Sequence, residues 1–181
     1  VYVYAASFHG KKLLALGGNS GNPIFDWFIG RELNPRIGEF DIKTFNELRP
    51  GLILWALLDI SCVCHQYTKF GWVSDSIVLV TLFHVWYIVD SLINESTILT
   101  QMDITTDGFG FMLSVGDLAW LPFTYCLQAR FLAFHPIHLG WLGVLAILAV
   151  QFTGYYIFRV ANLEKNEFRH GRNPKGTYAM R

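Results

Sequence analysis

The chain has 181 residues, of which 52% are hydrophobic, 16% aromatic and only 15% charged, whereas ordinary soluble domains carry about 25% charged residues. Basic and acidic groups balance to a net charge of zero, so bulk electrostatics gives no argument for nucleic-acid binding. This composition argues against a soluble domain and predicts an all-α, multi-pass transmembrane helical bundle.

The first eight residues are apolar and aromatic, with neither a positively charged start nor a small-residue cleavage site. They predict the end of an earlier helix rather than a signal peptide, so we expect the chain to be a fragment of a longer protein. Residues 18–38, GNSGNPIFDWFIGRELNPRIG, are instead dense in glycine and charge. Because Arg31, Glu32 and Arg36 are too polar for lipid, a structured loop facing the cytosol is predicted for residues 17–50.

Four stretches are predicted to cross the membrane, where about 20 apolar residues are needed. Residues 137–160 are apolar up to Arg159. Residues 74–99 and 112–134 are long enough, but they carry ionisable groups that belong inside a bundle rather than in lipid. Residues 51–64 are short and form a span only if His65 and Gln66 lie at the interface.

Basic residues suggest the orientation of these spans. If Arg159 and the residues after it face the cytosol, alternation of the spans places residues 17–50 on the same side, whereas the opposite loops hold little beyond Lys69. Such charges either only set the topology or also bind a cytosolic anion, and the pattern leaves both readings open. The two segments together hold Arg31, Arg36, Lys43, Arg49, Lys165, Arg169, Arg172, Lys175 and Arg181.

Polar residues inside the spans are the first candidates for chemistry. Those in residues 74–99 recur at spacings of three or four and share one helical face: His84, Tyr87, Ser91 and Asn94 or Glu95, with Asp90 three residues after Tyr87. A phenol, an imidazole and carboxylates on one face can deliver a proton. Interhelical hydrogen bonding is the alternative interpretation.

Other polar groups give weaker indications. A looser stripe is formed by Asp117, Thr124 and Gln128. For Asp117, a functional role and an interhelical hydrogen bond are equally good interpretations. Residues 100–111 carry Asp103 and Asp107 in a glycine-containing acidic turn. His135 and His138 have a spacing that could bind a metal, but they fall at a proline-containing turn between two spans, which favours interfacial histidines. The cysteine spacing favours buried thiols, and no metal site is predicted.

Beyond Arg159, Lys165 and Arg169 lie one helical turn apart. They either bind an anionic group such as phosphate or form a solvated basic cluster. The pattern alone favours the solvated cluster.

Three motifs carry a resemblance to a known family. They are GNPIFDWFIGRELNPRIGEFDIKTFNELRPG, ILTQMDITTDGFGFMLSVGDLAWLPFTY and GYYIFRVANLEKNEFR. Together they resemble the sterol reductases that act on the C14 double bond, especially those of fungi, whose relatives are lamin B receptor and the C7 reductase (7-dehydrocholesterol reductase). The resemblance covers residues 18–169.

The resemblance implies a multi-pass oxidoreductase of the endoplasmic reticulum membrane. Such an enzyme uses NADPH to reduce the C14=C15 double bond of a sterol in ergosterol-type synthesis, by protonation and then hydride transfer. Its implied partners are the sterol substrate and the lipid bilayer, and no nucleic-acid partner is evident. A non-catalytic scaffold of the lamin B receptor kind and a C7 sterol reductase are the alternatives.

The resemblance also assigns roles to residues. The basic pair of the family's KNxFR motif holds cofactor phosphate, which implies this role for Lys165 and Arg169. The tyrosine of the helix before MDIT is a proposed proton donor in the family, which implies this role for Tyr87, and either Asp90 or an acidic group outside these residues is expected to orient it. Arg31 and Arg36, in a loop expected to cover the cofactor cleft, complete the predicted cofactor-binding set.

The chain departs from the family pattern near its end. The family continues into GWWGxxRHxNYxGD, which does not follow here, and the family's NPxDP is replaced by NPKGT. We therefore expect residues 1–181 to be a partial sterol reductase membrane domain, with residues 162–181 as a cytosolic juxtamembrane segment. Whether these residues are active by themselves is left open.

Overall fold

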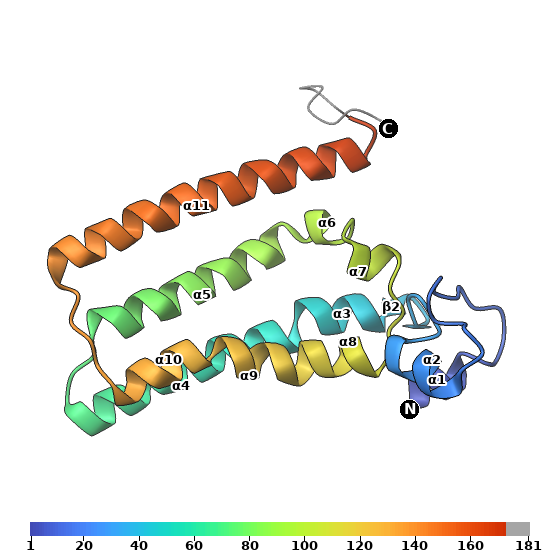
Figure 1. The fold of residues 1–181 in the computed structure, drawn as a ribbon, viewed down its shortest axis with the longest axis horizontal. Helices are drawn as coiled ribbons and strands as arrows, with labels where there is room; N and C mark the ends of the chain where they lie inside the picture. Colours follow the sequence, from blue (N-terminus) through green and yellow to red (C-terminus); the bar gives the residue numbers. More distant parts are fainter. Residues whose placement is uncertain (173–181) are drawn as a thin grey trace.

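Three long helices dominate the computed structural model, which describes residues 1–172 (Figure 1). They are α4 (Pro50–Phe70), α5 (Asp75–Ile93) and α11 (Gly140–Arg169). Helix α3 (Ile42–Leu48) leads into α4, and the two together form one apolar stretch of 29 residues. This stretch, α5 and α11 are each long and apolar enough to cross a membrane, so the predicted all-α, multi-pass architecture is confirmed.

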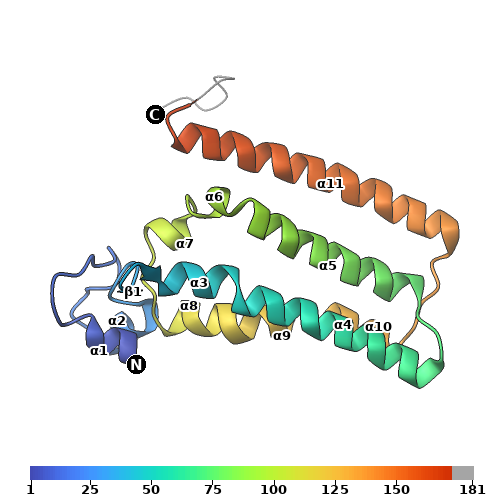
Figure 2. The same ribbon diagram turned by 180° about the vertical axis from the view of Figure 1, so that it is seen from behind.

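The predicted span 112–134 is a run of shorter helical pieces beside α4 (Figure 2). They are α8 (Phe111–Val115), the π-helical turn η1 (Gly116–Trp120), α9 (Leu121–Tyr125) and α10 (Leu127–Phe134). Pro122 stands at the start of α9 and has no N–H to donate, so the regular hydrogen-bond ladder is interrupted there. The wide turn of η1 directly precedes this point.

Helix α4 is longer than residues 51–64 because its polar end is satisfied inside the protein. Gln66 is fully buried, its Nε2 donating to the carbonyl of Leu132 at 2.7 Å and its Oε1 accepting from the amide of Ser74 at 2.7 Å. The helix then ends at Gly71, whose φ of 77° is the left-handed conformation that glycine adopts readily. His65 is exposed, as an interfacial residue would be.

The apolar core lies between α4, α5 and the α9–α10 run. One cluster joins Leu52, Trp55, Ile88 and Cys126, and a second joins Ile77, Ala129, Leu132 and Ala133. Helix α11 is different because none of its residues is buried. Its first turn is held by Asp75, whose carboxylate accepts from the amides of Leu139 and Gly140 at 3.0 Å.

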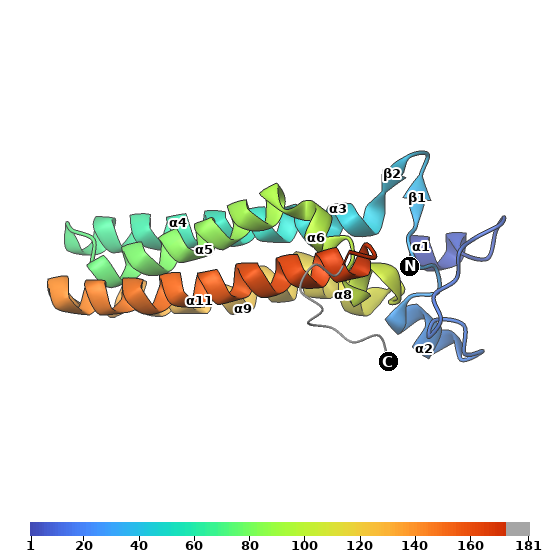
Figure 3. The same cartoon turned by 90° about the horizontal axis from the view of Figure 1, so that it is seen from above.

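The N-terminal 41 residues form a small folded region at one end of the bundle (Figure 3). It contains α1 (Tyr2–Ala6), α2 (Pro23–Ile29) and a two-stranded hairpin of β1 (Arg36–Ile37) and β2 (Phe40–Asp41). Helix α2 and the hairpin lie within the loop predicted for residues 17–50, whereas residues 42–50 belong to α3 and the start of α4. The cytosolic side of the loop remains a prediction.

Glycines join this region to the loop after α7 (Met102–Thr105). Gly30 has a φ of +104°, and a Cβ placed on it would lie 2.3 Å from the backbone nitrogen of Gly110. The backbones therefore meet where a side chain cannot fit. Next to this contact, the amide of Phe109 donates to the carbonyl of Glu32 at 3.0 Å. The GRELNPR motif thus packs directly on the MDITTDGFGF motif.

Both basic segments lie at this same end of the bundle. Figure 1 shows the C-terminal end of α11 on the side of α1, α2 and β2, with the turns at 71–74 and 135–139 at the other end. This arrangement agrees with the alternation predicted from the charges. Lys175 and Arg181 lie outside the described residues, as does the juxtamembrane segment after residue 172.

Candidate active site

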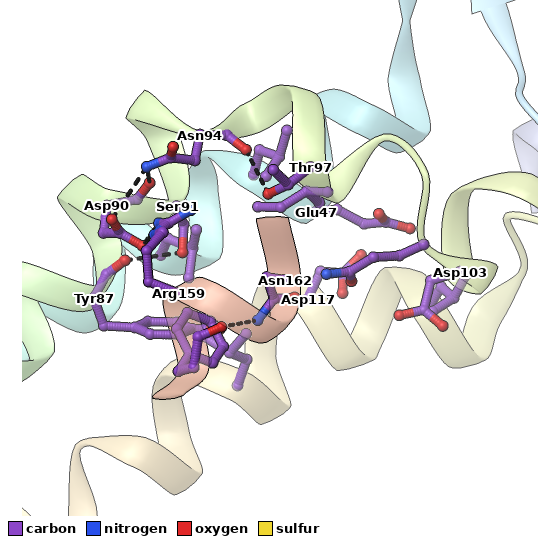
Figure 4. Close-up of a pocket in the computed structure, with 17 residues that line it drawn as sticks. Glu47, Tyr87, Asp90, Ser91, Asn94, Thr97, Asp103, Asp117, Arg159 and Asn162 are labelled. Atoms are coloured by element: carbon purple, nitrogen blue, oxygen red, sulfur yellow. Dashed lines mark hydrogen bonds and ion pairs between the residues drawn. The ribbon is translucent and has the colours of Figure 1, made fainter. Parts of the chain in front are cut away.

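Two cavities share a wall at the centre of the bundle. The polar cavity, of about 250 Å³, lies between α3, α5, η1 and α11 and is lined by Glu47, Asp90, Asp103, Asp117, Arg159 and Asn162 among others (Figure 4). The aromatic cavity, of about 500 Å³, is lined by Trp55, Val80, Phe83, His84, Tyr125, Gln128 and Gln151. Tyr87 and Leu121 line both.

Tyr87 has its ring at this boundary and is 46% exposed. Its ring centroid lies 5.9 Å from that of Trp55 and 6.4 Å from that of Phe158. Within residues 1–172, the phenol makes no hydrogen bond; only the Tyr87 carbonyl is engaged, accepting from the Ser91 hydroxyl at 2.8 Å. The Tyr87 hydroxyl is therefore available to a ligand in either cavity.

Asp90 binds groups other than Tyr87. Its carboxylate is paired with the Arg159 guanidinium of α11 and also accepts from the Tyr155 hydroxyl at 2.9 Å and the Asn94 amide at 3.1 Å. In an apolar setting, this pairing offsets the cost of both charges. Asp90 thus joins α5 to α11 and holds Arg159 at the polar cavity, and no hydrogen bond to Tyr87 supports the orienting role that was expected of it.

The opposite wall of the polar cavity is acidic. Glu47 and Asp117 each have one carboxylate oxygen that is shielded from solvent and lacks a hydrogen-bond partner within the described residues. Lys43 is fully buried and donates to the carbonyl of Asp107 at 2.5 Å. Because Asp117 lines the polar cavity and one of its oxygens has no partner, it does not serve as an interhelical hydrogen-bonding residue in the described part of the chain.

The other two residues of the looser stripe, Thr124 and Gln128, have different roles. The Thr124 hydroxyl donates to the carbonyl of Trp120 in the preceding turn, which engages it within its own helical run. Gln128 lines the aromatic cavity. Asp103, from the predicted acidic turn, lines the polar cavity, whereas Asp107 contributes its backbone carbonyl to Lys43.

Residues 1–180 match the model of a family described as the Ergosterol biosynthesis ERG4/ERG24 family. The chain belongs to this family. It is 65% identical over 173 residues to the Delta(14)-sterol reductase of Schizosaccharomyces pombe, covering 95% of this chain and 41% of the relative. It is 56% identical over 182 residues to that of Saccharomyces cerevisiae (94% and 42%) and 57% identical over 175 residues to that of Ascobolus immersus (93% and 41%).

The chain therefore spans about two fifths of the length of these curated relatives. The resemblance read from the three motifs is confirmed, and with it the family.

The basic residues predicted to bind the cofactor fall into two groups. On α11, Asn162 lines the polar cavity, and Lys165 and Arg169 follow at spacings of three and four, so they extend one helical face away from it. Both cations are exposed and make no ion pair or hydrogen bond with a described residue. Their charges are therefore free to bind an anion.

Arg31 and Arg36 are engaged elsewhere. Arg31 Nη1 donates to the carbonyl of Ser7 at 2.8 Å, and its guanidinium lies 4.1 Å from the centroid of the Phe8 ring. Arg36 pairs with Asp41 at 3.2 Å across the hairpin. Neither arginine lines the polar cavity, so the structure does not bring them together with Arg159, which does.

Three charged residues at the cavities or next to them were not predicted from sequence: Arg159 and Glu47 line the polar cavity, and Asp59 contacts His84 of the aromatic cavity. The sequence analysis uses Arg159 only to orient the spans, although an arginine at the end of an apolar stretch also suggests an intramembrane partner. Glu47 follows Lys43 at a spacing of four in a helix that continues into a span, and Asp59 is the lone carboxylate of residues 51–64. The same rule for buried charges would have singled out both.

Proposed function

We propose that the protein containing this chain is an NADPH-dependent Delta(14)-sterol reductase of the endoplasmic reticulum membrane. The observation that carries the proposal is the place of Tyr87 in the common wall of a polar and an aromatic cavity. A reductase must bring a polar cofactor and an apolar sterol to the same point, and this wall is such a point. The names of the curated relatives support the same activity.

The aromatic cavity supports the sterol side of the proposal. Its volume of about 500 Å³ lies within the range of about 300 to 1,000 Å³ that is usual for small-molecule sites. Its walls are mostly aromatic and aliphatic, from helices α4, α5 and α9, and the imidazole of His84 and the amides of Gln128 and Gln151 are the polar exceptions. Such a lining suits a rigid apolar ring system that enters from the bilayer.

The face of α11 supports the cofactor side. Arg159 is oriented by Asp90 at the polar cavity, and Lys165 and Arg169 continue the positive charge toward the end of the bundle that holds the other basic segment. Guanidinium and ammonium groups bind phosphate strongly. We infer that these residues hold the phosphates of NADPH, which supplies a hydride when bound.

An isolated alkene resists direct attack by a hydride, so a proton must reach one of its carbons first. Tyr87 offers an unbonded hydroxyl at the boundary of the cavities. As it gives its proton to the alkene, the opposite alkene carbon becomes cationic and can accept the hydride. Positioned acids of this kind contribute about 10² to 10⁴-fold to rates.

Two experiments test the proposal. Cells that lack the full-length gene should accumulate C14-unsaturated sterols, and the purified full-length protein should reduce such a sterol with NADPH. Accumulation of C7-unsaturated sterols would indicate the C7 reductase instead. A normal sterol profile, together with no turnover of either substrate, would contradict an enzymatic function and indicate a scaffold.

A further inference from the structure

A buried carboxylate contacts an imidazole beside the aromatic cavity. Asp59 of α4 is fully buried, and its Oδ2 lies 2.6 Å from Nδ1 of His84 on α5, whose side chain is 14% exposed. Asp59 Oδ1 has no partner within residues 1–172. A carboxylate inside a membrane span is costly unless an opposite charge or hydrogen bonds compensate it, so His84 is the group that compensates Asp59.

The contact determines which nitrogen of His84 faces the cavity. Trp55 Nε1 also lies near His84 Nδ1, at 3.2 Å, but Nδ1 cannot donate to Asp59 and accept from Trp55 at once. The shorter distance and the buried carboxylate assign the Nδ1 proton to Asp59. The other nitrogen, Nε2, then has no partner among residues 1–172, on a ring that lines the aromatic cavity.

His84 stands on the same helical face as Tyr87, three residues earlier. The Trp55 ring contacts both, with centroid distances of 4.5 Å to His84 and 5.9 Å to Tyr87. Besides Tyr87 and Tyr125, His84 is the one titratable residue lining the aromatic cavity in the described part of the chain. Asp90, the nearest carboxylate along α5, is occupied by Arg159, Tyr155 and Asn94.

We propose that Asp59 and His84 form a proton relay that restores the proton of Tyr87 after each turnover. This inference rests on the proposed function. The Tyr87 O–H bond breaks as its proton forms a C–H bond on the sterol, which leaves a tyrosinate; a bound NADPH would supply the hydride for the second C–H bond. The Nε2–H bond of protonated His84 then breaks and its proton returns to the Tyr87 oxygen.

Asp59 remains ionised throughout and acts as a positioning residue for the imidazole. It holds the Nδ1 proton and balances the imidazolium charge, and water then returns a proton to Nε2. Each turnover thus takes up one proton from water and one hydride from NADPH. The relay predicts that His84 matters for every turnover after the first, since Tyr87 begins protonated.

The test uses the purified full-length protein and rapid-mixing measurements of product. In His84→Gln, the first turnover should keep most of its rate, and the following steady-state rate should fall about 100-fold, within the usual range of a proton-transfer group. Added imidazole should partly restore the steady-state rate of His84→Ala. Asp59→Asn should show the same slow steady state without rescue. The exposed His135→Gln is the matched control and should behave as wild type.

Equal losses in the first and later turnovers would assign His84 to packing and overturn the relay, and so would an unchanged steady-state rate. Tyr87→Phe separates this outcome from failure of the proposed function. If Tyr87→Phe is inactive while His84→Gln shows no difference between turnovers, only the relay is wrong. If Tyr87→Phe is active, the acid assigned under the proposed function is wrong as well.

Discussion

The ion pair of Asp90 and Arg159 should be a main anchor of α11. Helix α11 has no buried residue, and its other polar anchor to α5 is Asp75 at its first turn. The side chains of Arg159 and Asp90 are only 17% and 11% exposed. Asp90→Asn keeps the size of the side chain and removes its charge, which leaves the Arg159 guanidinium without its ionic partner.

The expected cost follows from these contacts. A hydrogen bond to a charged group contributes about 1.5 to 3 kcal/mol, and removing one partner of a fully buried pair costs about 3 to 5 kcal/mol. Because this pair keeps some exposure and borders a cavity, the free energy of unfolding should fall by about 1.5 to 3 kcal/mol. Arg159→Gln should cost a similar amount.

Unfolding of the full-length protein in detergent micelles measures this free energy. The double variant should be about as stable as either single variant, because the two residues share one interaction. Arg36→Gln removes an ion pair in which the arginine side chain is 59% exposed, and it should cost below about 1 kcal/mol. A loss in Asp90→Asn no larger than this control, or additive losses in the double variant, would refute the anchoring role.

Three further outcomes are expected. Arg169→Ala should weaken NADPH binding by about 1.5 to 3 kcal/mol, measured by calorimetry on the full-length protein, while Lys69→Ala at the opposite end of the bundle should leave it unchanged. Tyr87→Phe should lower turnover by about two to four orders of magnitude with little change in stability or NADPH affinity; turnover near the wild-type rate would leave Tyr87 a packing residue. Hydrogen bonds from the Ser20 hydroxyl and amide lower the pKa of Asp26 below its usual 3.8. They therefore stabilise the fold of residues 18–30 at a pH above 3.8. This stabilisation is lost as the pH falls through the lower pKa that Asp26 has in the folded protein. Ser20→Ala should raise the pKa of Asp26, as an NMR titration would detect, and an unchanged value would contradict the assignment.

The sequence alone was sufficient for features that depend on local periodicity. The apolar stretches predicted the long helices, and spacings of three placed His84, Tyr87 and Asp90 on one side of α5. Both follow from the fixed geometry of the α-helix and from the lack of water in the bilayer. The three long motifs were likewise enough to predict the family.

The tertiary structure decided which of these faces meet. Asp90 is paired with Arg159, 69 residues away, and His84 with Asp59, 25 residues away. Arg31 binds the N-terminal segment instead of the α11 region. Helical periodicity determines the direction of a side chain relative to its own helix, but not which helix packs against it. Partner choice depends on the summed packing of all the helices, and only the folded bundle settles it.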